Sequence, residues 1–201
     1  MEQAFFNSFD NGDKFLMLDI KALILKCVVD GVSAQTVGKV IQVESAGNPW
    51  AINVNQKAVL IKKAEGKDEA VSQARSFLAK GYSIDVGLMQ INSENFKKYS
   101  LDITDVFDPC INIRVGSSIL KEAYSKTSKK TDDRQIALQK ALSIYNTGSS
   151  VKGYQNGYVK KYYHNSQFQN PYSSDLSVDF SAIYEREETD DRAKKSEPES
   201  D

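Results

Sequence analysis

Histidine and cysteine are scarce in this chain: its 201 residues include one histidine, His164, and two cysteines, Cys27 and Cys110. A zinc site usually needs more such ligands, and a Ser-His-Asp or Cys-His catalytic unit would have to use His164, which has no supporting pattern around it. Neither GxGxxG nor GxxxxGK[ST] occurs, which disfavours nucleotide chemistry. We therefore expect no metal and no other cofactor.

Long apolar runs are also missing. The most apolar stretch, 15–29, is interrupted by Asp19, Lys21 and Lys26, so we expect no membrane-spanning helix. The residues before it carry acidic rather than basic charge, and no small-residue cleavage site follows, which does not fit a signal peptide. Export by another route and prior removal of a signal both remain open.

Charge is distributed unevenly along the sequence. Residues 175–201 contain ten acidic and four basic side chains, whereas 1–174 contain 17 acidic and 22 basic ones. The weak positive charge of the larger part, without a basic stripe interleaved with aromatics, does not indicate nucleic-acid binding. We expect a leader over 1–13, one domain over 14–164 and an acidic, largely disordered tail over 165–201.

Hydrophobic periodicity predicts a mostly helical α+β domain with a small β element. Ser33, Asp68 and Ser93 are candidate N-caps, and Asp108-Pro109 is a strong helix start. The expected helices span about 14–29, 33–44, 69–80, 93–99, 108–126 and 132–146, and a small hairpin is expected within 51–63, where 51–55 and 58–62 flank a polar turn.

Glu44 interrupts an apolar stripe. Val37, Val40 and Ile41 mark one face of a helical stretch, and position 44 is the next place on that face. Gly47 then favours the end of the helix. A carboxyl held partly out of water favours its protonated form, which suits a general acid. A buried glutamate satisfied by hydrogen bonds is the structural alternative.

Three separated motifs need a common explanation: ESAGNP at 44–49, GLMQIN at 87–92 and ALSIYNTG at 141–148. In this order and spacing they resemble the lysozyme-like lytic transglycosylases with an SLT domain. The match is closer to the small members from type IV secretion and conjugation systems, which share the DPCINI motif at 108–113. The resemblance covers roughly 20–160 and implies a lysozyme-like fold with the β element beside the catalytic cleft.

The resemblance also implies a reaction and a partner. Such enzymes cleave the MurNAc–GlcNAc bond of peptidoglycan without consuming water, using one glutamate as acid and then as base, here Glu44. We expect a monomer in the periplasm or at the cell exterior that acts on glycan strands and opens the wall for a secretion or conjugation apparatus. Apparatus proteins would bind the tail.

Substrate-binding residues are expected around this acid. Gln90 and Asn92 alternate with two apolar residues, which places both amides on one side, and amides suit N-acetylated sugars because they donate and accept hydrogen bonds. Asn53 stands where many members of the wider family have a serine. The resemblance adds the remaining candidates, which are Ser45, Tyr145 and Asn146. Each of these also has a purely structural interpretation, in packing, in turns or at a helix end.

Asp85 is the candidate second carboxylate. In the cleft it would permit a hydrolytic, lysozyme-like mechanism, so a muramidase or chitinase-like enzyme is the first alternative. The structural interpretation, which we favour, is an aspartate that caps a local loop before Gly87. The second alternative is a wall-binding assembly factor with weak catalysis whose tail docks a partner.

The two cysteines allow two interpretations. Two thiols facing the core of a reduced protein would be unremarkable. In the resembled subfamily, equivalent cysteines suggest a disulfide, which here would join Cys27 to Cys110 and would favour an oxidising compartment.

Overall fold

The structure is a computed structural model that describes residues 20–56 and 59–163. The described residues fall into two compact units, each treated separately below. The first consists of the residues up to Cys27 together with Val40–Gly116, and the second of Val28–Lys39 together with the residues from Ser117 on. The leader at 1–13, the tail at 165–201 and His164 lie outside the described residues.

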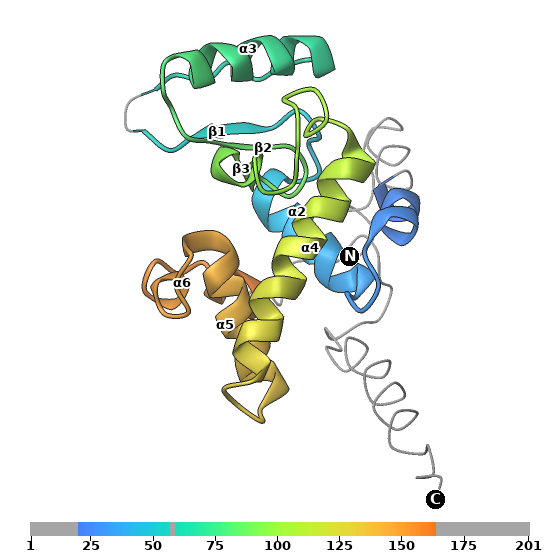
Figure 1. The fold of residues 1–201 in the computed structure, drawn as a ribbon, viewed down its shortest axis with the longest axis vertical. Helices are drawn as coiled ribbons and strands as arrows, with labels where there is room; N and C mark the ends of the chain where they lie inside the picture. The colour runs from blue at the N-terminus through green and yellow to red at the C-terminus, as the bar shows by residue number, and fades with distance from the viewer. Residues whose placement is uncertain (1–19, 57–58, 164–201) are drawn as a thin grey trace, which may run out of the picture. The chain divides into compact units, whose positions relative to one another are not determined.

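Helices dominate the architecture, as the periodicity predicted. A helical segment at 20–27 is followed by α2 (Ala34–Ser45), α3 (Lys67–Ala79) and the 3-10 helix η1 (Ser93–Asn95). The remaining helices are α4 (Pro109–Ser128), α5 (Arg134–Thr147), α6 (Lys152–Gln155) and α7 (Lys160–Tyr163) (Figure 1). Helices α2 and α4 each contribute residues to both units. No helix in the described parts of the chain is both long and apolar enough to cross a bilayer.

The β element is a three-stranded antiparallel sheet in the first unit, formed by β1 (Ile52–Val54), β2 (Ile84–Val86) and β3 (Ile91–Asn92) in that order. The hairpin expected within 51–63 is therefore wrong, because β1 pairs with β2 and residues 59–62 form no strand. Val59 and Ile61 pack on the core while Leu60 is 97% exposed. This segment thus alternates in burial like a strand without joining the sheet.

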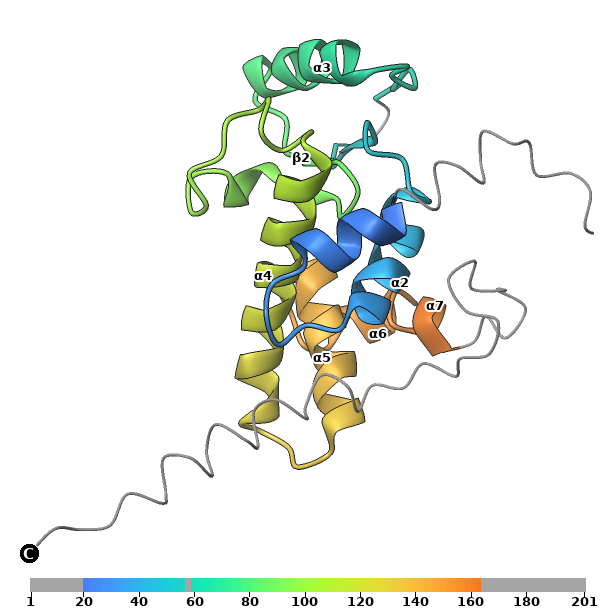
Figure 2. The ribbon, with the colours of Figure 1, turned by 90° about the vertical axis from the view of Figure 1, so that its right-hand side faces the viewer.

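One face of this sheet forms the small core of the first unit. Val54, Ile84 and Val86 point to the same face and are buried together with Ala70 and Ala74 of α3. Helix α3 runs along this side of the sheet and contacts β1 and β2 (Figures 1 and 2). Because side chains alternate along a strand, the opposite face carries the polar residues described below.

Two of the expected N-caps are wrong. Gly66 occupies the cap position of α3, so Asp68 lies in the first helical turn. Asn92, rather than Ser93, caps η1, and its side-chain oxygen accepts a hydrogen bond from the Glu94 amide at 2.9 Å. At α4 the prediction is confirmed, since the Asp108 carboxylate accepts a hydrogen bond from the Ile111 amide at 2.9 Å.

The second unit contains α5 and α6 packed against each other. Asp133 caps α5 by accepting hydrogen bonds from two amides, and Gly148 ends the helix at φ 70°. Ser143 is fully buried in α5 and accepts a hydrogen bond from the Gly153 amide of α6 at 2.9 Å. Tyr158 and Tyr162 are buried, and their hydroxyl oxygens lie 2.7 Å apart, so both belong to the core of this unit.

Candidate active site

Glu44 lies in the last turn of α2, one residue before the helix ends at Ser45. Val37 and Val40 are fully buried and Ile41 nearly so, whereas Glu44 on the same stripe is partly exposed. Ala46 and Gly47 then adopt positive φ values of 52° and 82°, which turn the chain away from the helix axis. The predicted placement of a partly buried carboxyl at a helix end is therefore confirmed.

Ser45 links the end of this helix to the GLMQIN motif. Its Oγ lies 2.8 Å from the Leu88 carbonyl oxygen and 3.1 Å from that of Ile41, one turn earlier in α2. A hydroxyl has a single proton to donate, and the shorter distance favours Leu88. Ser45 thus holds the turn between β2 and β3 next to the residue that carries the candidate acid.

Asn112 fixes the same turn from α4. Its side chain is 1% exposed; Oδ1 accepts from the Met89 amide at 2.8 Å, and Nδ2 donates to the carbonyls of Val86 and Val106 at 3.0 and 2.8 Å. Gly87 makes room for this amide, because a Cβ at that position would lie 2.2 Å from Nδ2. The φ of 78° at Gly87 also favours glycine.

Gln90 lies in this turn with a φ of 48°, so it does not occupy a regular strand position. Its Nε2 donates to the carbonyl oxygens of Gly87 and Ala51 at 2.9 and 3.2 Å. Met89 and Ile91 are buried while Gln90 and Asn92 are partly exposed, as the alternation predicted. The Gln90 amide nitrogen is thereby held in place by two backbone groups.

The polar face of the sheet carries one residue from each strand. Asn53 pairs with Asp85 and Asp85 with Asn92 across neighbouring strands. The Asp85 carboxylate accepts from Asn92 Nδ2 at 2.7 Å and from Asn53 Nδ2 at 3.4 Å. Asp85 is therefore the centre of a cross-strand amide–carboxylate row, not the loop-capping residue that the sequence favoured.

Tyr145 and Asn146 occupy the last turn of α5 in the second unit. Tyr145 is partly exposed, and Asn146 is exposed with its Oδ1 accepting from Asn156 Nδ2 at 2.9 Å. Glu44, Ser45, Asn53, Asp85, Gln90 and Asn92 all belong to the first unit. The pairing of Tyr145 and Asn146 with Glu44 stays a prediction.

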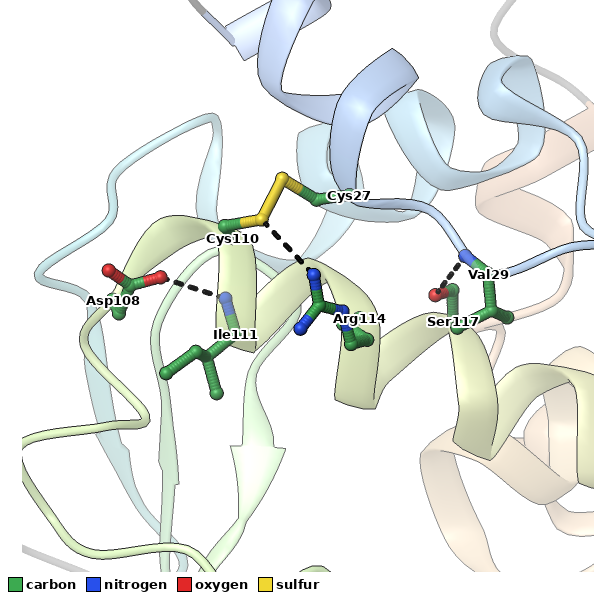
Figure 3. The surroundings of a disulfide bond; sticks show 7 residues. All are labelled: Cys27, Val29, Asp108, Cys110, Ile111, Arg114 and Ser117. Atoms are coloured by element: carbon green, nitrogen blue, oxygen red, sulfur yellow. Dashed lines mark hydrogen bonds between the residues drawn. A yellow bond between two sulfur atoms is a disulfide. The ribbon is translucent and has the colours of Figure 1, made fainter.

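Cys27 and Cys110 form a disulfide, which confirms the pairing suggested by the resemblance. Their Cα atoms lie 5.2 Å apart although the residues are 83 positions apart in the chain. Figure 3 shows the bridge between the helical segment 20–27 and the first turn of α4, with the Arg114 guanidinium 3.9 Å from Cys110 Sγ. The ring closed by this bridge contains every candidate site residue of the first unit.

The transglycosylase SLT domain family matches residues 26–168, which is most of the chain. The chain therefore belongs to this family. Its α+β architecture, with a small antiparallel sheet and an acid at the end of a helix, agrees with the lysozyme-like fold expected for such a domain.

Among curated proteins the chain is similar to type IV secretion system protein virB1 of Brucella suis biovar 1 (strain 1330), with 37% identity over 124 residues. That alignment covers 61% of this chain and 52% of the relative. Protein virB1 of Rhizobium radiobacter is 35% identical over 136 residues, covering 68% and 56%. The chain spans about half the length of these relatives. No solved structure gives a significant match.

Two features of the site escaped sequence reasoning. The role of Asn112 was missed, although an asparagine between Ile111 and Ile113, two residues after a core-facing cysteine, is a signal for a buried polar group with specific partners. The row formed by Asn53, Asp85 and Asn92 depends on strand register, which the sequence did not provide.

Proposed function

We propose that the chain is a peptidoglycan lytic transglycosylase that cleaves the β-1,4 bond between MurNAc and GlcNAc and leaves 1,6-anhydroMurNAc ends. The observation that carries this proposal is Glu44 at the end of α2, joined through Ser45 to the GLMQIN turn in a chain that belongs to the SLT family. A partly buried acid at a helix end suits proton transfer to a sugar oxygen, and the turn that Ser45 holds carries the fixed Gln90 amide.

In this mechanism Glu44 acts twice. Its protonated carboxyl first donates the proton to the glycosidic oxygen, and the bond from that oxygen to the anomeric carbon breaks. The carbonyl oxygen of the muramoyl N-acetyl group attacks the same carbon and forms a cyclic oxazolinium ion. The Glu44 carboxylate then takes the proton of the 6-hydroxyl, whose oxygen displaces the acetamido oxygen and closes the anhydro ring. No water is consumed and the glutamate ends protonated, ready for another cycle.

The neighbouring residues would bind and orient the sugars. Gln90 has its Nε2 committed to two carbonyl oxygens, so its Oε1 is oriented and can accept a hydrogen bond from an N-acetyl N–H. Asn53 would present its amide from the polar face of the sheet, and Asn92, whose amide is hydrogen bonded to Ser83, Asp85 and the Glu94 amide, would hold that face in shape. Tyr145 would orient Glu44 by hydrogen bonding, and Asn146 would support that position. Ser45 acts by holding the GLMQIN turn rather than by binding sugar.

A hydrolytic reaction is the second candidate function, because Asp85 could serve as its second carboxylate. Asp85 lies on the polar face of the sheet, where its two carboxylate oxygens accept hydrogen bonds from two amides, and a second carboxylate at a sugar site can act in hydrolysis. Membership of the SLT family favours the transglycosylase over this alternative.

Mass spectrometry of muropeptides released from purified sacculi separates the two reactions. We expect anhydro ends from the wild type and from Asp85→Asn, and no release by a folded Glu44→Gln variant. Glu65→Gln, the same change at an exposed glutamate, should keep full activity. Reducing ends that disappear with Asp85→Asn would instead establish hydrolysis, and an active Glu44→Gln variant would remove Glu44 from its role.

We further propose that the enzyme opens the wall locally for a type IV secretion or conjugation apparatus in the periplasm or at the cell exterior. The similarity to proteins named virB1 supports this purpose, and the disulfide favours an oxidising compartment. Deleting 165–201 tests whether the tail binds apparatus proteins. Loss of partner binding with intact wall cleavage is expected, while unchanged partner binding would exclude the tail as the docking segment.

A further inference from the structure

A cavity of about 240 Å³ lies beside the candidate active site, within the first unit. Asn48 and Trp50, which follow the end of α2, line it together with Ala51, the residue before β1. Lys62 and Lys63 of the segment before α3 and Gln73 of α3 line it as well. We refer to this space as the Trp50 cavity.

Glu69 holds the lysine-bearing wall in place. Its carboxylate accepts hydrogen bonds from the Glu65 amide at 2.9 Å, from Lys62 Nζ at 3.2 Å and from Gln73 Nε2 at 3.3 Å. Two of these donors, Lys62 Nζ and the Glu65 amide, attach residues 62–65 to α3, whereas Gln73 lies in α3 itself. Residues 62–65 are consequently held against α3, and the ion pair with Glu69 partly neutralises the charge of Lys62.

The charge of this cavity is of one sign. Among the described residues that line it, two are lysines and none is acidic. Lys63 is exposed, so its ammonium group can attract an anion from solvent without a large desolvation cost. Asn48 and Gln73 add amide groups, and the Trp50 side chain, which is partly buried, adds an apolar wall suited to the stem of a short side chain.

The Trp50 cavity is also connected to the candidate sugar site. Ala51, which lines the cavity, accepts hydrogen bonds through its carbonyl oxygen from Gln90 Nε2 at 3.2 Å and from the Gly87 amide at 2.9 Å. Ala51 would therefore contact a ligand in the cavity and, through its carbonyl oxygen, contacts the side chain of Gln90. A substrate that spans both sites must carry a branch next to its sugar ring.

We propose that the Trp50 cavity binds a carboxylate of the peptide stem that branches from the muramoyl sugar, with Lys63 as its principal cation. This inference rests on the proposed function, because peptidoglycan supplies both the glycan and the stem. Drug-sized ligands fill pockets of roughly 300–1,000 Å³, so a space of about 240 Å³ suits one or two residues of an acidic peptide rather than a whole stem.

The single tryptophan of the chain makes the proposal directly testable. Fluorescence excited at the red edge of tryptophan absorption comes from Trp50 alone and reports on the cavity without any need for catalysis. The full chain is titrated with soluble stem tetrapeptide and with the same peptide amidated at its carboxyl groups. Lys63→Glu is the test variant, and Lys129→Glu, at an exposed lysine of the second unit, is the matched control.

We expect a saturable fluorescence change that gives a Kd for the tetrapeptide. This Kd should rise about tenfold with Lys63→Glu and with amidation of the peptide, which is the change expected for the loss of one charge-assisted hydrogen bond. The Kd should be unchanged with Lys129→Glu. The absence of a saturable change, or equal Kd values for wild type and Lys63→Glu, would overturn the proposal. Because the titration needs no turnover, a chain that binds the stem but releases no muropeptides would refute the proposed function and leave this site standing.

Discussion

Opening the disulfide between Cys27 and Cys110 should strongly destabilise the first unit. In the chain-entropy model a cross-link stabilises the fold by restricting the unfolded chain, and the effect grows with the length of the ring. A separation of 83 residues corresponds to about 4.5 kcal/mol at 25 °C. Since small domains have a total stability of roughly 5–15 kcal/mol, this one bond would supply a large fraction of it.

Equilibrium unfolding in urea followed by Trp50 fluorescence tests this magnitude, because Trp50 belongs to the first unit. Wild type is compared in its oxidised form and after reduction, together with Cys27→Ala/Cys110→Ala. With an m-value of about 2 kcal/mol per molar urea, the midpoint should fall by roughly 2 M in both reduced protein and double variant. The reduced wild type serves as the control for lost side-chain packing, since its sulfur atoms remain.

A fall of less than about 1 kcal/mol in both proteins would refute the chain-entropy argument. It would mean that the reduced, unfolded chain already holds the two ends of the ring together. A fall in the double variant alone would assign the effect to the buried Cys27 side chain, which is 2% exposed, and not to the cross-link.

Three further predictions follow from particular contacts. Asn112→Ala leaves the Met89 amide and two carbonyls without their partner, so the free energy of unfolding should fall by about 3–5 kcal/mol. The control Asn55→Ala, at an exposed asparagine, should change it by less than about 0.5 kcal/mol. Equal losses in the two variants would contradict the role given to Asn112. Ser143→Ala removes the acceptor of the buried Gly153 amide and should cost about 1–3 kcal/mol in urea unfolding; a neutral result would mean that water replaces the hydroxyl. The hydrogen bond from the Glu65 amide, together with Lys62 and Gln73, lowers the pKa of the Glu69 carboxyl. The ionised Glu69 carboxylate therefore stabilises the fold above the unfolded-state pKa of about 4.3, and this stabilisation is lost as the pH falls through the lower folded-state value. The difference in Tm between wild type and Glu69→Gln should therefore vanish in acid, and a difference that persists at pH 2 would argue against this assignment.

Local signals predicted the longer helices well because several of their ends are determined by neighbouring residues, whereas the helix expected over 93–99 is only the 3-10 helix η1 (Ser93–Asn95). Asp108 and Pro109 fix the start of α4, and Gly148 fixes the end of α5, without help from the rest of the chain. The same local reasoning failed for β1. Its partner is β2, which lies beyond α3 in the sequence, and the apolar segment at 59–62 offered a nearer but incorrect partner.

The candidate site shows the same division between local and distant information. The placement of Glu44 followed from helical periodicity, because the stripe that it interrupts lies within one helix. The hydrogen bonds of Asp85 with Asn53 and Asn92 depend on strand register, and the contacts of Asn112 depend on segments brought together by folding. Neither could be obtained from spacing in the sequence alone.

The contact between Gly87 and Asn112 also has an evolutionary consequence. A side chain at position 87 would collide with the amide at position 112, and a smaller residue at 112 would relieve that collision only by abandoning three backbone groups. The residues at positions 87 and 112 therefore cannot change independently during evolution, because the residue at one position limits which residues the other accepts. A library randomised at position 87 alone should return glycine, because the φ of 78° and the Val106 carbonyl oxygen, 3.0 Å from a Cβ at that position, oppose a side chain as well.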